Sequence, residues 1–309
     1  MKPIEKHLLL KSLPTQEVGI EISPLYRPAT DRSIHNVHYT DYTSAEDSRE
    51  KHAHYEHPEI MDLDFIWTPG KKLSECTPVG IEYHWAIASH VLEHVPDPIG
   101  WLLEVFEVMN EGGVFSLALP EKTQTFDRNR RISETSDLIH AWLSEDKRPN
   151  TKQLYDFLSK VTSEDGNGNI FSEHHYTKEE ALNFTLNSYT TGQYFDAHCS
   201  VFTKDSFVAV INELNELGIL NVKVSEPIEG VDEFYIQLKK VGEPKLSRPV
   251  PFKADDETVS AITNEIKEKQ LEHYIKAYKE AIDVQDTLKK HIAELEKLKP
   301  SIWNRIFGR

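Results

Sequence analysis

The sequence contains very little cysteine. Of its 309 residues only two are cysteines, Cys76 and Cys199, and they form no C-x-x-C pair. This excludes a disulfide-stabilised scaffold and fits a reducing compartment. No apolar run approaches the roughly 20 residues that a membrane-spanning helix needs. We therefore expect a cytoplasmic protein.

Positive charge is also scarce. The chain has 35 Lys and Arg against 51 Asp and Glu, a formal net charge of −16. The electrostatic field of this negative charge repels phosphate backbones, so we expect no nucleic-acid partner. The strongest basic run is Asp127–Glu134, DRNRRISE. It is either a solvated turn or helix face or an anion-binding element.

Short apolar runs alternate with amphipathic segments in the first 120 residues. We expect a helix over Gly100–Asn110, ended by the E-G-G of Glu111–Gly113. The predicted strands are Glu17–Ser23, Asn36–Asp41, Asp64–Pro69, Tyr83–Ser89 and Val114–Pro120. This alternation predicts an α/β fold with a doubly wound, mostly parallel sheet of Rossmann-like type.

The chain after this region has a different pattern. Residues of about 121–200 are polar and helix-rich, which predicts a helical cap or insertion. A helix over Ser206–Gly218 and an antiparallel pair of strands at the sheet edge, over residues 221–230 and 233–241, would complete the first domain. We predict a domain over 1–241 and a proline-rich linker over 242–256.

The last segment, 257–309, is predicted to be a charged C-terminal helix with an amphipathic tail. An imperfect heptad-like stripe of apolar residues favours either a coiled coil between copies or packing against the same chain. The stripe comprises Leu271, Ile275, Tyr278, Ile282, Leu288, Ile292 and Leu295. The tail Ser301–Arg309 would contact a membrane surface or a partner, or dock on its own chain.

The stretch SHVLEHVPDP contains H-x-x-E-H, formed by His90, Glu93 and His94. On a helix this is the spacing of a zinc pair in inverted zincin peptidases, with the glutamate as general base. The context argues against that interpretation. His90 follows an apolar run, so it lies at the end of a strand, and two prolines follow His94 within four residues.

A different interpretation uses the carboxyl ends of the predicted strands, where open α/β sheets bind ligands. The first strand ends near Glu21 and Ser23, and the fourth at Ser89–His90. The second ends at Asp41, about twenty residues after the first, where a carboxylate can accept hydrogen bonds from both hydroxyls of a ribose. These positions predict a nucleoside cofactor across the strand ends.

The segments GIEIS, VHYTDY and WAIASHVLEHVPDPIGWLLEVFEVMNEGGVFSLALPEKTQTFD resemble the class I S-adenosylmethionine-dependent methyltransferases. They resemble in particular a bacterial branch associated with polysaccharide and glycan biosynthesis. YFDAHCSVFTKDSFVAVINELNELG and EFYIQLKK extend the resemblance to about residues 15–240. One position departs from the family, because Ser23 stands where a glycine normally lets the backbone approach the cofactor.

The resemblance implies S-adenosyl-L-methionine as cofactor and assigns roles to individual residues. It implies that the cofactor is lined by Glu21, Ser23, Asp41, Ser89 and His90, with Trp67 and Thr68 beside the adenine; simple core packing is the alternative for Trp67. The candidates for the catalytic base are His94, Asp127 and His198, and those for acceptor binding are Arg130 and Asp196. Each of these could instead make a structural polar contact.

The sequence shows no compact set of metal ligands, so no metal is assigned. We expect a methyltransferase that O-methylates a small-molecule acceptor, a sugar or a glycan, and that forms a homo-oligomer or contacts a membrane surface through its tail. The alternative is a non-catalytic scaffold built on a methyltransferase-like domain, which Ser23 in the glycine position would favour.

Overall fold

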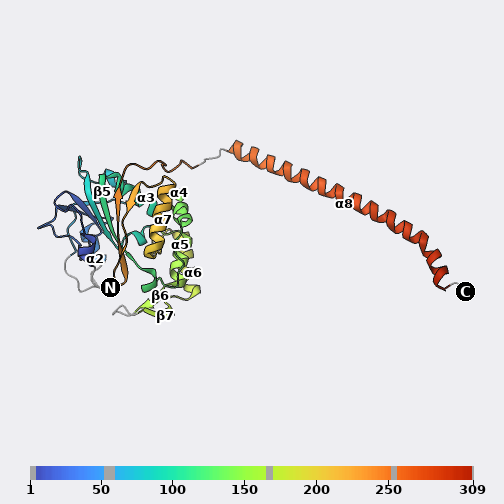
Figure 1. Cartoon of the computed structure of the whole chain (residues 1–309), viewed down its shortest axis with the longest axis horizontal. Coiled ribbons are helices and arrows are strands. Elements are labelled where there is room, and N and C mark those ends of the chain that lie inside the picture. Colours follow the sequence, from blue (N-terminus) through green and yellow to red (C-terminus); the bar gives the residue numbers. More distant parts are fainter. Residues whose placement is uncertain (1–4, 52–59, 165–169, 252–255, 308–309) are drawn as a thin grey trace. The chain divides into compact units, whose positions relative to one another are not determined.

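The computed structural model describes residues 5–51, 60–164, 170–251 and 256–307 (Figure 1). The chain divides into two compact units, residues 1–249 and 250–309. The first unit contains a mixed, mostly parallel sheet with flanking helices, as the sequence predicted. The second contains one long helix.

The main sheet has eight strands in the order β3-β2-β1-β4-β5-β10-β8, and β9 pairs with β10. The strands β1 to β5 pair in parallel, whereas β10 is antiparallel to β5, β8 and β9. Their bounds are β1 Gly19–Ile22, β2 Val37–Asp41, β3 Phe65–Ile66, β4 Tyr83–Ser89, β5 Met109–Pro120, β8 Val222–Val224, β9 Ile228–Glu229 and β10 Glu233–Lys240. The strand order reverses between β1 and β4, which is where such sheets bind ligands.

The helices of the first unit are α1 Lys6–Leu9, α2 Ala45–Lys51, α3 Pro98–Glu107, α4 Thr135–Ser144, α5 Thr151–Lys160, α6 Lys178–Thr191 and α7 Lys204–Glu216. Three short 3-10 turns are η1 Leu73–Glu75, η2 Leu92–His94 and η3 Lys122–Gln124. Figure 1 shows α5 and α6 beside a small antiparallel hairpin of β6 Thr162–Glu164 and β7 Ile170–His174. The segment predicted to be a helical cap therefore also contains a hairpin, which its polar sequence did not indicate.

Strand β4 separates the two apolar cores. Ala86 and Ala88 belong to one buried cluster, and Trp85 and Ile87 belong to the other. Successive side chains of a strand point to opposite faces, so this alternation places a core on each side of the sheet. The first core packs against α3, α4 and α7, and the second packs against α1.

Helix α3 is confirmed, but it begins two residues earlier and ends three residues earlier than the predicted Gly100–Asn110. Pro98 occupies its first turn, and the Asp97 side chain caps it by accepting from Gly100 N at 2.9 Å. The prediction that E-G-G ends this helix was wrong. Those residues lie in β5, where the pairing with β4 jumps from Met109 to Val114, and Gly112 provides the positive φ of 85° in that irregularity.

Two further sequence predictions concern the C-terminal part of the sheet and the second unit. The antiparallel pair of strands is confirmed, although β10 lies inside the sheet and β8 forms the edge. In the second unit, α8 spans Asp256–Phe307, and its side chains from 263 to 297 are exposed. Within the described residues, no helix has both the length and the apolar character required to cross a bilayer.

We predict that Gly19→Ala destabilises the first unit strongly. A Cβ atom on Gly19 would lie 2.0 Å from the Trp85 ring, which is held in place because its Nε1 donates to Glu17 O at 2.8 Å. Overpacking of this kind costs about 3 kcal/mol in the free energy of unfolding. The measurement is denaturant unfolding followed by tryptophan fluorescence.

Gly80→Ala is the matched control for this change. Gly80 has a positive φ of 80° and open space around it, so only the backbone strain of about 1 kcal/mol should appear. Equal losses of stability in the two variants would contradict the predicted clash.

Candidate functional site

The loop after β1 is organised by the buried carboxylate of Glu21. It accepts hydrogen bonds from Ala29 N at 2.6 Å, from Thr30 N at 3.1 Å and from Thr30 Oγ1 at 2.5 Å. Burial raises the pKa of this carboxyl, and the three hydrogen bonds oppose that shift. Glu21 therefore orders the loop from within, and its contact with the cofactor stays a prediction.

Ser23 takes the conformation that a glycine would favour. Its φ is 54°, in the left-handed region, and its Oγ donates to Asp41 Oδ1 at 2.9 Å. Tyr42 N donates to the same oxygen at 2.7 Å. Because two donors hold Oδ1, the Asp41 carboxylate has a fixed orientation at the carboxyl end of β2.

The neighbouring strand ends carry the other residues expected around the cofactor. Ser89, the last residue of β4, has a buried Oγ without a hydrogen-bond partner among the described residues. Trp67 N donates to Asp41 O at 2.9 Å, and the Trp67 ring stacks on Trp101 with centroids 6.1 Å apart. Thr68 is the next residue in the chain after Trp67. An unsatisfied hydroxyl and an oriented carboxylate at the strand ends on either side of β1 fit a polar nucleoside ligand.

His90 follows β4 and is held between two carboxylates. Its Nε2 lies 2.5 Å from Glu233 Oε2, and its Nδ1 lies 3.4 Å from Glu93 Oε1. Burial alone would lower the pKa of His90, but the two carboxylates outweigh this effect and raise the pKa to about 10. The imidazole is therefore a cation at neutral pH and is unsuited to accept a proton.

The other two histidines named by the sequence lie against each other. His94 and His198 have ring centroids 4.6 Å apart in an edge-to-face arrangement. His94 Nδ1 bonds to Asp196 Oδ1 at 2.9 Å, and His198 Nδ1 bonds to Asp127 Oδ2 at 2.5 Å. The structure thus brings together four residues that are separated by up to 104 positions in the sequence.

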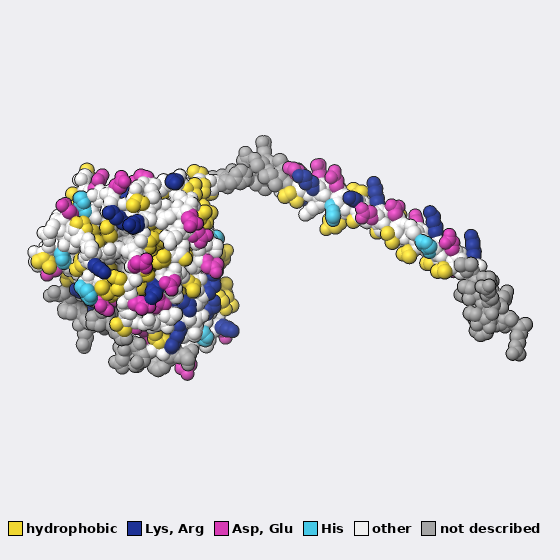
Figure 2. Space-filling model, viewed as in Figure 1, with side chains coloured by type: hydrophobic (Ala, Val, Ile, Leu, Met, Phe, Trp, Pro, Cys, Tyr) yellow, Lys and Arg dark blue, Asp and Glu magenta, His cyan; other side chains and the backbone are white. Residues whose placement is uncertain are grey.

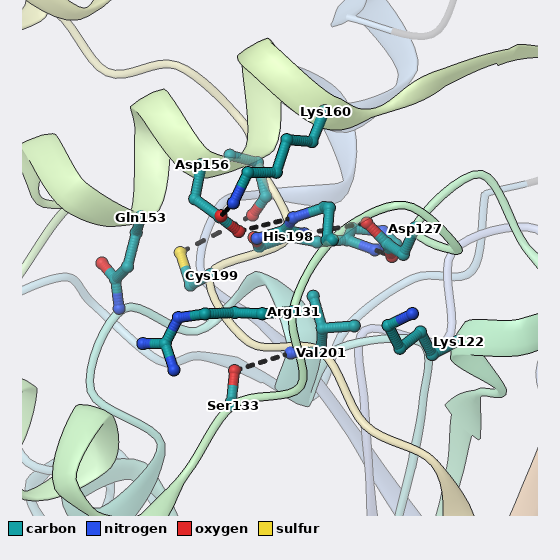
Figure 3. A network of polar contacts seen from close by, with 12 residues as sticks. Lys122, Asp127, Arg131, Ser133, Gln153, Asp156, Lys160, His198, Cys199 and Val201 are labelled. Carbon is teal, nitrogen blue, oxygen red and sulfur yellow. Dashed lines mark hydrogen bonds and ion pairs between the residues drawn. The ribbon is translucent and has the colours of Figure 1, made fainter. Parts of the chain in front are cut away.

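Asp127 and Arg130 form a buried ion pair with Nη1–Oδ1 at 2.8 Å. The other Arg130 nitrogens also have protein partners, since Nε donates to Asp156 at 3.0 Å and Nη2 donates to His198 O at 2.8 Å. Figure 3 shows Asp127 directed at His198, with Asp156 above them on α5. These contacts fix the His198 ring, and the role of Arg130 in acceptor binding stays a prediction.

Two acidic residues at the site were not among the predicted site residues. Glu93 belonged to the H-x-x-E-H motif, and its backbone carbonyl accepts from Cys199 N at 2.6 Å, which joins η2 to the segment that carries His198. Glu233 lies 143 residues after His90, so no local pattern could have indicated this contact. The motif itself spans a strand end and a 3-10 turn, so it lacks the continuous helix that the inverted zincin arrangement requires.

A separate cavity of about 430 Å³ lies in the 121–200 segment. It is lined by residues 145–151 and by parts of α5 and α6, including Thr185, Ser188 and Tyr189. None of the predicted site residues lines it, so it is distinct from the strand-end site.

Residues 9–215 match the family model described as a methyltransferase domain. The chain belongs to this family. Its class I fold is that of the S-adenosylmethionine-dependent methyltransferases, and S-adenosylmethionine is its cofactor. The family assignment supports the enzyme over the non-catalytic scaffold. No curated protein matches the sequence.

Three solved structures illustrate the similarity. The CurJ carbon methyltransferase has 13% identity and a TM-score of 0.37; the match covers 75% of this chain and 51% of that one, so this chain spans about half its length. A Listeria monocytogenes protein assigned as an S-adenosylmethionine-dependent methyltransferase has 12% identity, coverage of 76% and 96%, and a TM-score of 0.38. The plantazolicin methyltransferase BpumL in complex with SAH has 8% identity, coverage of 76% and 80%, and a TM-score of 0.36.

We predict that Asp41→Asn weakens binding of S-adenosylhomocysteine by about tenfold or more, because a charge-assisted hydrogen bond is worth about 1.5–3 kcal/mol. Isothermal titration calorimetry measures the dissociation constant. The control is Asp62→Asn, which removes a largely exposed carboxylate paired with Arg49. Unchanged affinity in the Asp41 variant would contradict a ribose contact.

Proposed function

We propose that this methyltransferase transfers the methyl group to a hydroxyl oxygen of a sugar or glycan-related acceptor. The observation that carries this proposal is the His94–His198 pair beside the end of β4. Each imidazole uses Nδ1 for a carboxylate and retains Nε2 for another partner. Two such nitrogens suit a hydroxyl acceptor, which must lose a proton in order to react.

The bound cofactor supplies an activated methyl group, so the protein needs to contribute positioning and proton removal. Asp41, oriented by Ser23, would hold the ribose, and Glu21 would keep the surrounding loop in place. Ser89 would form a hydrogen bond to the same ligand through its buried hydroxyl. His90 would remain a cation between Glu93 and Glu233, which leaves the chemistry on the acceptor to His94 and His198.

The class of acceptor is supported by charge and by resemblance. An overall charge of −16 disfavours polyanionic acceptors. The resemblance of GIEIS, VHYTDY and the following segments to a polysaccharide-associated branch favours a sugar or glycan. Asp196, whose side chain is 60% exposed, would contact such an acceptor.

We predict that His94→Ala and His198→Ala lower kcat by about 10²-fold or more while leaving the dissociation constant for S-adenosylhomocysteine within a few fold. The measurement is release of S-adenosylhomocysteine with a panel of mono- and oligosaccharides. The control is His7→Ala, whose side chain is 74% exposed and lies on α1. Full turnover by both histidine variants on every accepted sugar would contradict the proposal.

We also propose that 257–309 pairs with the same segment of a second copy and that 242–256 acts as a linker. The apolar stripe on α8 supports this, because its residues are 38% to 69% exposed (Figure 2). An exposed stripe at near-heptad spacing favours a partner helix. Contact of the Ser301–Arg309 tail with a membrane surface remains a further proposal.

We predict that Ile275→Glu together with Ile282→Glu converts a dimer into a monomer, because the two charges would be buried in the paired helices. Light scattering after gel filtration measures the mass. The control is His273→Glu, which lies on the opposite side of the helix from Leu271 and Ile275. If the native chain has the mass of a monomer at every concentration, self-association is wrong.

A further inference from the structure

Three side chains with metal-binding atoms converge beside the end of β4. Glu93 and His94 come from η2, and His198 comes from the segment between α6 and α7. One ligand atom from each of them lies within 4.8 Å of the other two. Two imidazoles and a carboxylate form the ligand set of many catalytic zinc sites.

The orientation of both histidines supports this. Asp196 binds Nδ1 of His94 at 2.9 Å, and Asp127 binds Nδ1 of His198 at 2.5 Å. In metalloproteins a carboxylate on one ring nitrogen fixes the tautomer and increases the basicity of the other nitrogen. Both Nε2 atoms are then the natural ligand atoms.

The Glu93 carboxylate provides an independent observation. Its side chain is 2% exposed, and neither oxygen has a hydrogen-bond partner among the described residues. The nearest charged group is His90, with Nδ1 at 3.4 Å from Oε1. His90 therefore compensates the charge on the Oε1 side only, and a second cation would compensate the buried Oε2, which has no partner among the described residues.

We propose that Glu93, His94 and His198 bind a divalent first-row transition cation, with zinc as the best match to the ligand set. Ligand atoms around such an ion lie about 3.4 Å apart when each bond is about 2.1 Å long. The present arrangement, with its ligand atoms within 4.8 Å of one another, would contract by up to about 1.4 Å on binding the ion. Three protein ligands leave a coordination position for water or an oxygen of the acceptor.

This inference deepens the proposed function and rests on it for the identity of the fourth ligand. A hydroxyl oxygen on the cation loses its proton far more readily than a free hydroxyl, because the metal stabilises the oxyanion. The two histidines would then act as ligands, and the proton would pass to solvent water. The oxyanion would form the new bond to the methyl group as the bond between methyl and the cofactor sulfur breaks, which releases S-adenosylhomocysteine. Asp127 and Asp196 would be positioning residues, since each acts through a histidine.

The test uses full-length protein without an oligohistidine tag, dialysed against a chelator and then into metal-free buffer. Calorimetric titration with zinc chloride should show about one ion bound per chain. Cobalt chloride should give the visible absorption of a four- or five-coordinate site. Binding of neither ion, or binding that leaves the cobalt spectrum octahedral, would overturn the proposal.

Variants locate the ion. Glu93→Gln and His198→Ala should abolish binding, and Asp196→Asn should weaken it by about 10–100-fold, which a purely structural contact would not do. His7→Ala should bind as the native chain does. Should a buried variant fail to fold, His94→Ala serves instead, because that side chain is 34% exposed. Native affinity in His94→Ala or Asp196→Asn would overturn the assignment.

The metal site and the proposed function fail separately. S-adenosylhomocysteine binding without zinc or cobalt binding would refute only the metal site. Zinc binding without turnover on any hydroxyl acceptor would leave the site in place and refute the proposed acceptor chemistry.

Discussion

The whole site depends on the parallel pairing of β1 with β2 and β4. Ile22 pairs with Thr40 on one side and with Ala88 on the other. This register brings the residues that follow each strand to one edge of the sheet. Ser23 can then donate to Asp41 although 18 residues separate them. A slip of one residue would turn each of these side chains to the opposite face.

A network of buried charges joins this edge to the cap. His90 lies between Glu233 of β10 and Glu93 of η2, and the Glu93 carbonyl accepts from the backbone of the segment that carries His198. Arg130 donates to Asp127, to Asp156 of α5 and to the His198 carbonyl. Buried charges are tolerated only when they are paired. The network therefore fixes the cap segment relative to β4 and keeps the rings of His94 and His198 in one orientation.

The sequence predicted the parts of the fold that are determined by local patterns. The apolar runs identified β1, β2, β4 and β5, and the residues at their ends placed Ser23, Asp41 and Ser89 at one edge. The E-G-G segment was misassigned because a glycine pair fits both a helix end and an irregular strand, and only the pairing with β4 distinguishes the two.

The contacts that complete the cluster could not be predicted, because they join residues far apart in the chain. His94 meets Asp196 across 102 residues, and His90 meets Glu233 across 143. The sequence suggested His94 and His198 separately, without indicating that their rings pack together. It also treated Glu93 only as part of a peptidase motif. The compact ligand set of Glu93, His94 and His198 forms only in the folded chain, where η2 is hydrogen-bonded to the 197–200 segment.

Ser23 shows how a residue that departs from a family pattern can still serve the same site. A left-handed backbone costs a non-glycine residue about 1–2 kcal/mol. The hydrogen bond from its Oγ to Asp41, at 2.9 Å, stabilises the turn by about 1 kcal/mol or somewhat more, because the acceptor is charged. The two terms nearly cancel, so serine keeps the turn that glycine would form. It also adds a donor that orients the carboxylate, which glycine could not do.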